Sequence, residues 1–122
     1  MPVRNICDCP NPPGGNIACA PHQMALCGVI NGILHRECLE PPVNVSPLIL
    51  VNWAAEQITG RITAADKIDI STLQLLKDGR YIQSNMAVVK FVLPESIKEA
   101  INAVESLMEA AKPQEQKKLE AY

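Results

Sequence analysis

The alternation of apolar and polar positions is clearest between residues 24 and 38, where it predicts a β-hairpin. Asn31-Gly32, which favours a two-residue type I′ turn, separates two short apolar runs. The turn fixes the register, which pairs Ile30 with Ile33, Val29 with Leu34, Gly28 with His35 and Cys27 with Arg36. Because side chains alternate between the two faces of a strand, Cys27, Arg36 and Cys38 are predicted to share one face.

Apolar positions at three- and four-residue spacing predict two main helices. The first begins at Ser46-Pro47, with serine as N-cap and proline at the first helical position, and ends at Gly60 as a left-handed cap. The second covers Glu95 to Ala111, and Lys112-Pro113 is expected to end it. Its apolar stripe consists of Ile97, Ala100, Ile101, Val104, Leu107, Met108 and Ala111.

The chain between the two helices carries weaker signals. A run rich in valine predicts a buried strand, and glycine and proline residues mark the ends of the elements. The predicted elements are a turn at Thr63–Asp66 or a short strand at Lys67–Ile70, a helix at Thr72–Asp78 capped by Ser71 and ended by Gly79, and a strand at Asn85–Leu93 entered through Tyr81-Ile82.

These elements predict an α+β fold. An N-terminal loop rich in cysteine, proline and glycine and a β-hairpin come first, followed by two main helices with one or two short strands between them. Two proline-containing segments suggest a division into 1–42 (cysteine-rich loop and hairpin), 43–112 (α+β scaffold) and 113–122 (polar tail). A chain of 122 residues would leave each half short of core if split, so one compact domain is expected overall.

Composition and charge exclude several functions. An apolar content of 48% is ordinary for a globular protein, which argues against disorder. Aromatic residues make up only 3%, so the stacking platforms used for single-stranded nucleic acids are missing. The net charge is −2 and no basic run exceeds Lys117-Lys118, which disfavours binding to duplexes or membrane phosphates.

The ends and apolar runs of the chain predict a cytoplasmic protein. The first five residues lack the apolar stretch of a signal peptide, and the longest apolar run, Leu48–Val51, cannot span a bilayer. In a reducing compartment, clustered cysteines more often bind metals or serve redox chemistry than form disulfides. The odd number of cysteines, five, agrees with this interpretation.

All five cysteines and both histidines lie between Cys7 and Cys38. Cys7 and Cys9 are too close in sequence to form an unstrained disulfide with each other, but they can share a metal ion. Cys19 and His22 form a second close pair, and the intervening proline- and glycine-rich loop can fold back. The four residues would make a tetrahedral site for zinc or iron, and Cys27 in place of His22 gives an all-sulfur alternative.

The order of two close cysteines, a gap, and then a cysteine followed by a histidine resembles the NEET (CDGSH) iron–sulfur proteins. That resemblance covers residues 7–22 and implies a [2Fe–2S] cluster held by three cysteines and one histidine. The sequence departs from the family pattern in the gap length, in the spacing of Cys19 and His22, and in lacking Asp-Gly after the third cysteine.

Two further interpretations leave the cysteines without a metal. Free cysteine often packs as a small buried hydrophobe. Alternatively, disulfides Cys7–Cys19 and Cys27–Cys38 would leave Cys9 free. The histidines could each form a catalytic dyad, Cys19 with His22 or Cys27 with His35, but no glycine motif for an oxyanion and no orienting carboxylate accompanies either.

The sequence therefore predicts a small structural-zinc module without catalytic activity, which binds a protein partner or self-associates. Its metal ligands would be Cys7, Cys9, Cys19 and either His22 or Cys27. A redox or iron–sulfur protein is one alternative, and an oligomerisation or interaction domain with disulfide-bonded or inert cysteines is another.

Overall fold

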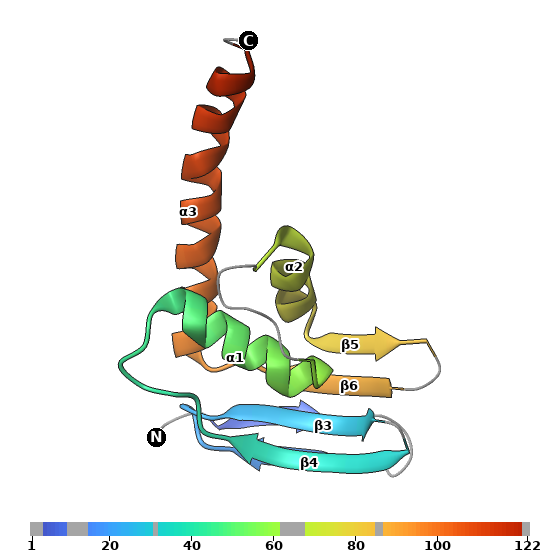
Figure 1. The fold of residues 1–122 in the computed structure, drawn as a ribbon. Coiled ribbons are helices and arrows are strands. Elements are labelled where there is room, and N and C mark those ends of the chain that lie inside the picture. Colours follow the sequence, from blue (N-terminus) through green and yellow to red (C-terminus); the bar gives the residue numbers. More distant parts are fainter. Residues whose placement is uncertain (1–3, 10–14, 31, 62–67, 85–86, 121–122) are drawn as a thin grey trace.

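A computed structural model describes residues 4–9, 15–30, 32–61, 68–84 and 87–120, with side chains through residue 109. These residues form three helices and six strands in two antiparallel sheets. Figure 1 shows how the labelled helices lie on one side of the larger sheet. The predicted α+β class is confirmed. None of the helices in these ranges is both long enough and apolar enough to cross a membrane.

The larger sheet has four antiparallel strands in the order β4-β3-β6-β5. β3 (Met24–Ile30) and β4 (Ile33–Leu39) form the predicted hairpin. Their register confirms the prediction in every pair, including Ile30 with Ile33 and Cys27 with Arg36. The turn type itself lies outside the described residues, because Asn31 is not among them.

The chain between the two main helices forms two strands, within the one or two that were predicted. β5 (Arg80–Gln83) and β6 (Ala87–Val92) pair with each other in a second antiparallel hairpin. Tyr81-Ile82 is therefore part of a separate edge strand and not the entry into the next one. The valine-rich β6 is central, because it also pairs with β3 along its other edge.

Helix α1 (Pro47–Thr59) begins and ends as predicted, with the Ser46 side chain accepting from the Ile49 backbone N–H and Gly60 in the left-handed conformation. Helix α2 (Ile70–Asp78) ends at Gly79 as predicted but is capped by Asp69 instead of Ser71. Asp69 accepts the backbone N–H of Thr72 at 2.9 Å. Because Ile70 lies in this helix, the alternative prediction of a strand at Lys67–Ile70 is wrong at its C-terminal end. The predicted turn at Thr63–Asp66 lies outside the described residues.

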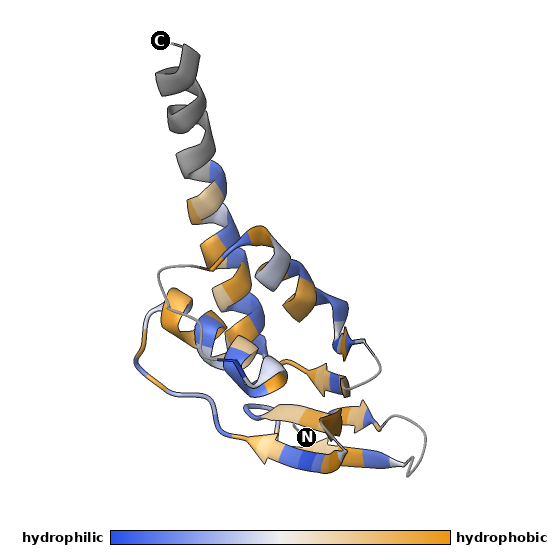
Figure 2. Cartoon of the chain, turned by 45° about the vertical axis from the view of Figure 1, so that its right-hand side comes forward, coloured by the Kyte–Doolittle hydropathy of each residue, from blue (hydrophilic) through white to orange (hydrophobic). Residues whose placement is uncertain are grey.

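Helix α3 (Glu95–Glu120) is longer than predicted, because it continues through Pro113. Proline removes one backbone donor, and a helix can absorb that loss as a local defect without ending. In Figure 1, α3 runs upward past α1 and α2, and in Figure 2 its coloured part carries both hydrophobic and hydrophilic positions.

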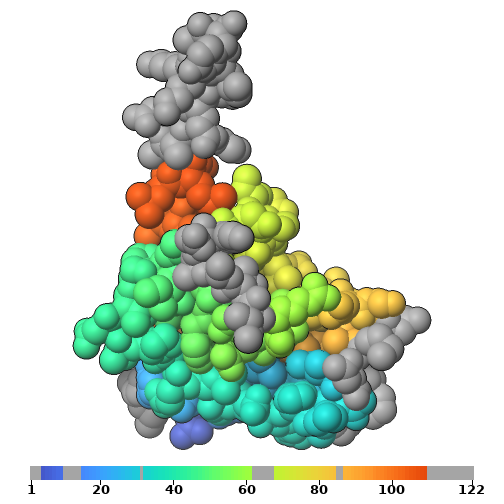
Figure 3. Space-filling model, viewed as in Figure 1, coloured from blue at the N-terminus to red at the C-terminus, as the bar shows by residue number. Residues whose placement is uncertain are grey.

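The helices cover one face of the four-stranded sheet, here called the helix face. Every second residue of the central strands points to this face, and Met24, Leu26 and Phe91 pack there against α1, α2 and α3 in the main core. In Figure 3, α1 lies above β3 and β4, which form the lower part of that view. The opposite face is the hairpin face, because β1 (Asn5–Asp8) and β2 (Asn16–Cys19) form a two-stranded hairpin against it.

The strand pairing links the two segments that the sequence suggested. β3 lies in the segment 1–42 and β6 in the segment 43–112, yet the two strands are hydrogen-bonded neighbours. The N-terminal cysteines are thus positioned by a sheet whose other half comes from much later in the chain. The division at residue 42 remains a prediction about organisation.

Candidate functional site

The chemistry-bearing residues gather where the β1–β2 hairpin meets the sheet. The register of this hairpin pairs Cys7 with Ile17 and Asn5 with Cys19. Alternation along the two short strands turns Cys7, Ile17 and Cys19 toward the sheet and leaves Ile6 and Ala18 outside. The result is a second, small core made of Cys7, Cys9, Cys19, Ala25 and Cys27, with Ile17 and Val92 packed against it.

One disulfide joins the end of β1 to the centre of the sheet. Cys9 is bonded to Cys27 of β3, with their Cα atoms 5.2 Å apart. The Cys9 backbone N–H also donates to the Gly15 carbonyl oxygen, which closes the base of the loop between β1 and β2. Cys27 is fully buried, so this bond lies inside the small core.

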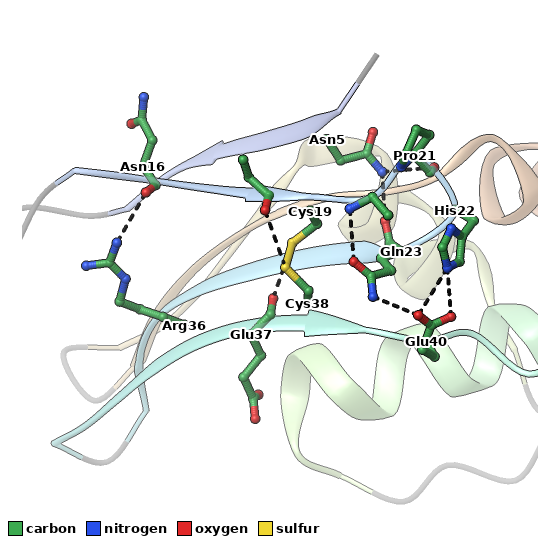
Figure 4. Close-up of a disulfide and its surroundings, with 12 residues drawn as sticks. Asn5, Asn16, Cys19, Pro21, His22, Gln23, Arg36, Glu37, Cys38 and Glu40 are labelled. Atoms are coloured by element: carbon green, nitrogen blue, oxygen red, sulfur yellow. Dashed lines mark hydrogen bonds and ion pairs between the residues drawn. A yellow bond between two sulfur atoms is a disulfide. The ribbon is translucent and has the colours of Figure 1, made fainter. Parts of the chain in front are cut away.

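A second disulfide joins β2 to the edge strand β4. Cys19 is bonded to Cys38 with a Cα separation of 5.4 Å, as Figure 4 shows. Beside it, Arg36 donates from Nη2 to the Asn16 carbonyl oxygen at 3.2 Å. Cys19 is buried and Cys38 is exposed, so this bond reaches the protein surface. The two disulfides together fix both strands of the small hairpin to the larger sheet.

Cys7 is the one free cysteine, and it is buried with 2% of its surface exposed. Burial raises the pKa of the Cys7 thiol above its ordinary value, and the positive charge of Lys90 opposes that shift. A thiol with a raised pKa and no access to solvent is mostly protonated at neutral pH and reacts slowly. Cys7 is therefore placed as a packing residue of the small core.

The prediction of a zinc or iron–sulfur site is wrong. Of the proposed ligands, Cys9 and Cys27 are bonded to each other, and Cys19 is bonded to Cys38. No group of three or more histidine, cysteine, aspartate or glutamate side chains that could hold a metal ion occurs in the described part of the chain. Thiolates that have been oxidised to disulfides cannot serve as metal ligands in the way that the prediction requires.

The disulfide interpretation is correct in kind, but its pairing was wrong. The expected bonds were Cys7–Cys19 and Cys27–Cys38, with Cys9 free. Cys27 and Cys38 are not bonded to each other. They lie in adjacent rows of the hairpin face rather than directly opposite each other, since Cys27 pairs with Arg36 and Cys38 with Ala25. Each of them is instead bonded to a cysteine of the β1–β2 hairpin segment, Cys27 to Cys9 and Cys38 to Cys19, and Cys7 remains free.

Neither histidine takes part in the cysteine cluster as a ligand. His22 Nε2 lies 3.0 Å from a carboxylate oxygen of Glu40, and Gln23 donates to the same carboxylate at 2.7 Å (Figure 4). The hydrogen bonds from Gln23 and then His22 lower the pKa of Glu40. His35 lies on the other face of β4, 3.8 Å from Glu37. Neither Cys19–His22 nor Cys27–His35 is available as a dyad, because both cysteines are oxidised.

A cavity of about 430 Å³ lies between α2, the end of β6 and α3. Its lining includes the buried side chains of Leu76, Phe91 and Ile101 together with Lys77 and Lys98. Lys77 forms an ion pair with Glu105, and Lys98 lies 3.8 Å from Glu95. Because both ammonium groups already face carboxylates, the cavity offers a ligand mainly an apolar wall.

The half of the hairpin face beyond the small hairpin carries a feature that the sequence analysis missed. Four apolar side chains lie there in register, one on each strand of the sheet, and three of them are exposed: Leu34, Ile82 and Val88. The fourth is Val29. The alternation of apolar and polar residues along each strand places these side chains on one face. The row could be predicted only if Arg80–Gln83 was recognised as a strand that pairs with β6.

No protein family matches the sequence, and no curated protein and no solved structure matches the chain. The resemblance of residues 7–22 to NEET proteins thus gains no support, and the disulfides occupy two of the four residues it would need, Cys9 and Cys19.

Proposed function

We propose that this protein is a small disulfide-stabilised interaction domain that works in an oxidising compartment. The single observation that carries the proposal is the pair of disulfides that fix β1 and β2 to the sheet. Disulfides persist in secreted, periplasmic and other oxidising settings and are rare where glutathione keeps thiols reduced. This proposal replaces the expected cytoplasmic location.

The size of the small core supports a structural role for the disulfides. Among the residues that the structure describes, this core holds, apart from the cysteines, only Ala25 and two partly buried side chains, Ile17 and Val92. So little apolar surface cannot hold a two-stranded hairpin in place, because such hairpins are marginal by themselves. The disulfides close 18- and 19-residue separations, for which the chain-entropy model gives roughly 3 kcal/mol each.

The state of Cys7 favours interaction over redox chemistry as the role of this domain. A redox protein needs a thiol of low pKa that solvent can reach, often next to a resolving cysteine. Cys7 has the opposite properties, since it is buried and its pKa is raised. Exposed apolar side chains on the sheet, described above, give the domain a surface through which it can bind a partner or a second copy.

The test is a thiol count combined with unfolding. Protein purified without reductant should have a denatured mass that lacks two hydrogens for each of the two disulfides. One thiol, Cys7, should react with iodoacetamide only after unfolding. Addition of reductant should lower the urea midpoint and abolish amide protection in β1 and β2 before it does so in β3. A protein that keeps five reactive thiols after exposure to an oxidising glutathione buffer would overturn the proposal.

A further inference from the structure

We propose that the half of the hairpin face which, among the described residues, β1 and β2 leave open is a docking surface for an acidic amphipathic helix of a partner protein. The inference rests on the proposed interaction function and specifies its surface and the chemistry of its partner. The surface consists of two neighbouring rows of side chains. The apolar row contains Leu34, Val29, Val88 and Ile82, and the basic row contains Arg36, Lys90 and Arg80.

The apolar row crosses the whole sheet. Register places Leu34 of β4 opposite Val29 of β3, Val29 opposite Val88 of β6, and Val88 opposite Ile82 of β5. The exposed fractions are 46% for Leu34, 37% for Val88 and 55% for Ile82. A single exposed apolar residue on a surface means little, but a continuous row of them marks an interaction site.

The basic row lies directly beside the apolar one, two residues along each strand. Arg36, Lys90 and Arg80 occupy its positions on β4, β6 and β5. The position on β3 is Cys27, which the small hairpin covers through the bond to Cys9, so the basic row follows the edge of that hairpin. Arg36 also donates to the Asn16 carbonyl oxygen there. None of the strand positions that point to this face of the larger sheet within the described residues holds an acidic side chain. Arg80 Nε lies 4.0 Å from a carboxylate oxygen of Asp78, the residue two positions before it.

The dimensions of the surface suit one short helix. Neighbouring strands are about 4.8 Å apart, so the row from β4 to β5 is roughly 14 Å long. At about 1.5 Å per residue, a helix of roughly ten residues laid across the strands covers that length. Apolar side chains at three- and four-residue spacing would contact the apolar row, and acidic side chains on one flank would meet the basic row.

Charge argues for an acidic partner over the other occupants. A second copy of this face would bring arginine and lysine but no carboxylate from its own strands to Arg36, Lys90 and Arg80. An anionic bilayer would attract the basic row but repel a chain whose net charge is −2. An acidic helix satisfies both rows at once, because it supplies apolar contact and opposite charge in the same segment.

The experiment is a selection from a phage-displayed library of random 12-residue peptides on the oxidised, full-length chain. Enriched peptides should combine leucine, isoleucine or phenylalanine at helical spacing with aspartate or glutamate. The variants Leu34→Glu and Ile82→Glu, both on edge strands and both at exposed positions, should weaken binding of such a peptide at least about tenfold. Leu107→Glu, at an exposed position on α3, is the matched control and should bind normally.

Chemical-shift mapping on the unmutated protein gives a readout that does not depend on variants folding. Addition of the selected peptide should shift amides of β3, β4, β5 and β6 around the apolar row, and binding should weaken as ionic strength rises. Three results would each overturn the inference: enriched peptides without acidic residues, self-association that Ile82→Glu abolishes, or binding to phosphatidylserine vesicles in place of any peptide. The disulfide count tests the proposed function separately, so a correct count with no acidic-peptide binding would remove the docking surface alone.

Discussion

A Cβ atom at Gly28 would lie 2.2 Å from the carbonyl oxygen of Val88 and 2.6 Å from the Cα atom of Val89. Gly28 is in β3, in register with Val89 of β6, at the point where the first and second halves of the chain pair. The backbone of β6 therefore occupies the space that any side chain at residue 28 would need. Glycine is required here for close approach of two strands rather than for an unusual dihedral angle.

We predict that Gly28→Ala lowers the free energy of unfolding by roughly 3 kcal/mol or more, because the added methyl group meets rigid backbone in a buried sheet. The measurement is urea denaturation of oxidised protein. Gly60→Ala is the matched control, since Gly60 has φ of 69° but nothing within 4 Å of its Cβ position. That substitution carries only the left-handed backbone penalty of about 1 kcal/mol. Equal losses in the two variants would contradict the close approach of β3 and β6.

Removing the Cys9–Cys27 disulfide should lower the free energy of unfolding more than removing the Cys19–Cys38 disulfide does. The two close loops of nearly equal length, with separations of 18 and 19 residues, so their entropic contributions should match at roughly 3 kcal/mol. Cys27 is fully buried, however, whereas Cys38 is exposed, so substituting the first pair by alanine also leaves a cavity in the small core. Thermal unfolding of the two double variants checks this order.

Reduction of the native protein should occur in two steps. Cys38 is exposed, so a phosphine or a small thiol can reach the Cys19–Cys38 bond without unfolding. Cys9 is 8% exposed and Cys27 is 0% exposed, so their bond should open only when the hairpin has moved away. Timed quenching with iodoacetamide and peptide mapping should show Cys19 and Cys38 labelled first. Simultaneous labelling of all four cysteines would show that the hairpin is released as a unit.

The cap of α2 should make a pH-dependent contribution to stability. The backbone N–H of Thr72 and then the hydroxyls of Ser71 and Thr72 donate to Asp69 and lower its pKa. Because the folded-state pKa is depressed, the contribution is complete above the unfolded value of about 3.9 and is lost as the pH falls through the folded value. Asp69→Ala should therefore cost about 1 kcal/mol at neutral pH and less in acid.

Asp69→Asn is the control for that experiment. Asparagine caps helices about as well as aspartate but carries no titrating carboxyl group. Its stability should stay close to that of the unmutated protein at neutral pH, and the difference between the two should change only in the acid range. If Asp69→Ala lost the same stability at every pH, the carboxylate of Asp69 would not be the group responsible.

Local signals sufficed for much of the fold. Asn31-Gly32 predicted the β3–β4 hairpin with its full register, and Ser46-Pro47 and Gly60 predicted both ends of α1. These features depend on turn and cap chemistry within a few residues, which the sequence carries directly. The same local reasoning missed β1 and β2, because four-residue strands without clear apolar alternation are held by what they pack against.

The disulfide pairing could not be predicted from neighbouring residues in the sequence. Five cysteines within 32 positions allow many pairings, and their spacing alone does not distinguish between them. Cys7 and Cys9 looked equivalent, yet Cys9 reaches Cys27 while Cys7 turns into the small core without a partner. That difference depends on where β1 lies over β3 and β6.

The sequence by itself determined the α+β class, the hairpin register and the ends of α1, because each depends on short-range periodicity and capping. Tertiary structure alone decided the disulfide partners and the row that joins Leu34 to Ile82. The disulfide partners depend on how β1 and β2 lie over β3 and β4. The row depends on β6, whose residues pair with residues of β3 that lie 57 to 67 positions earlier in the chain. Only the folded sheet brings those strands together, since contacts across such separations depend on the packing of the whole core rather than on any local pattern.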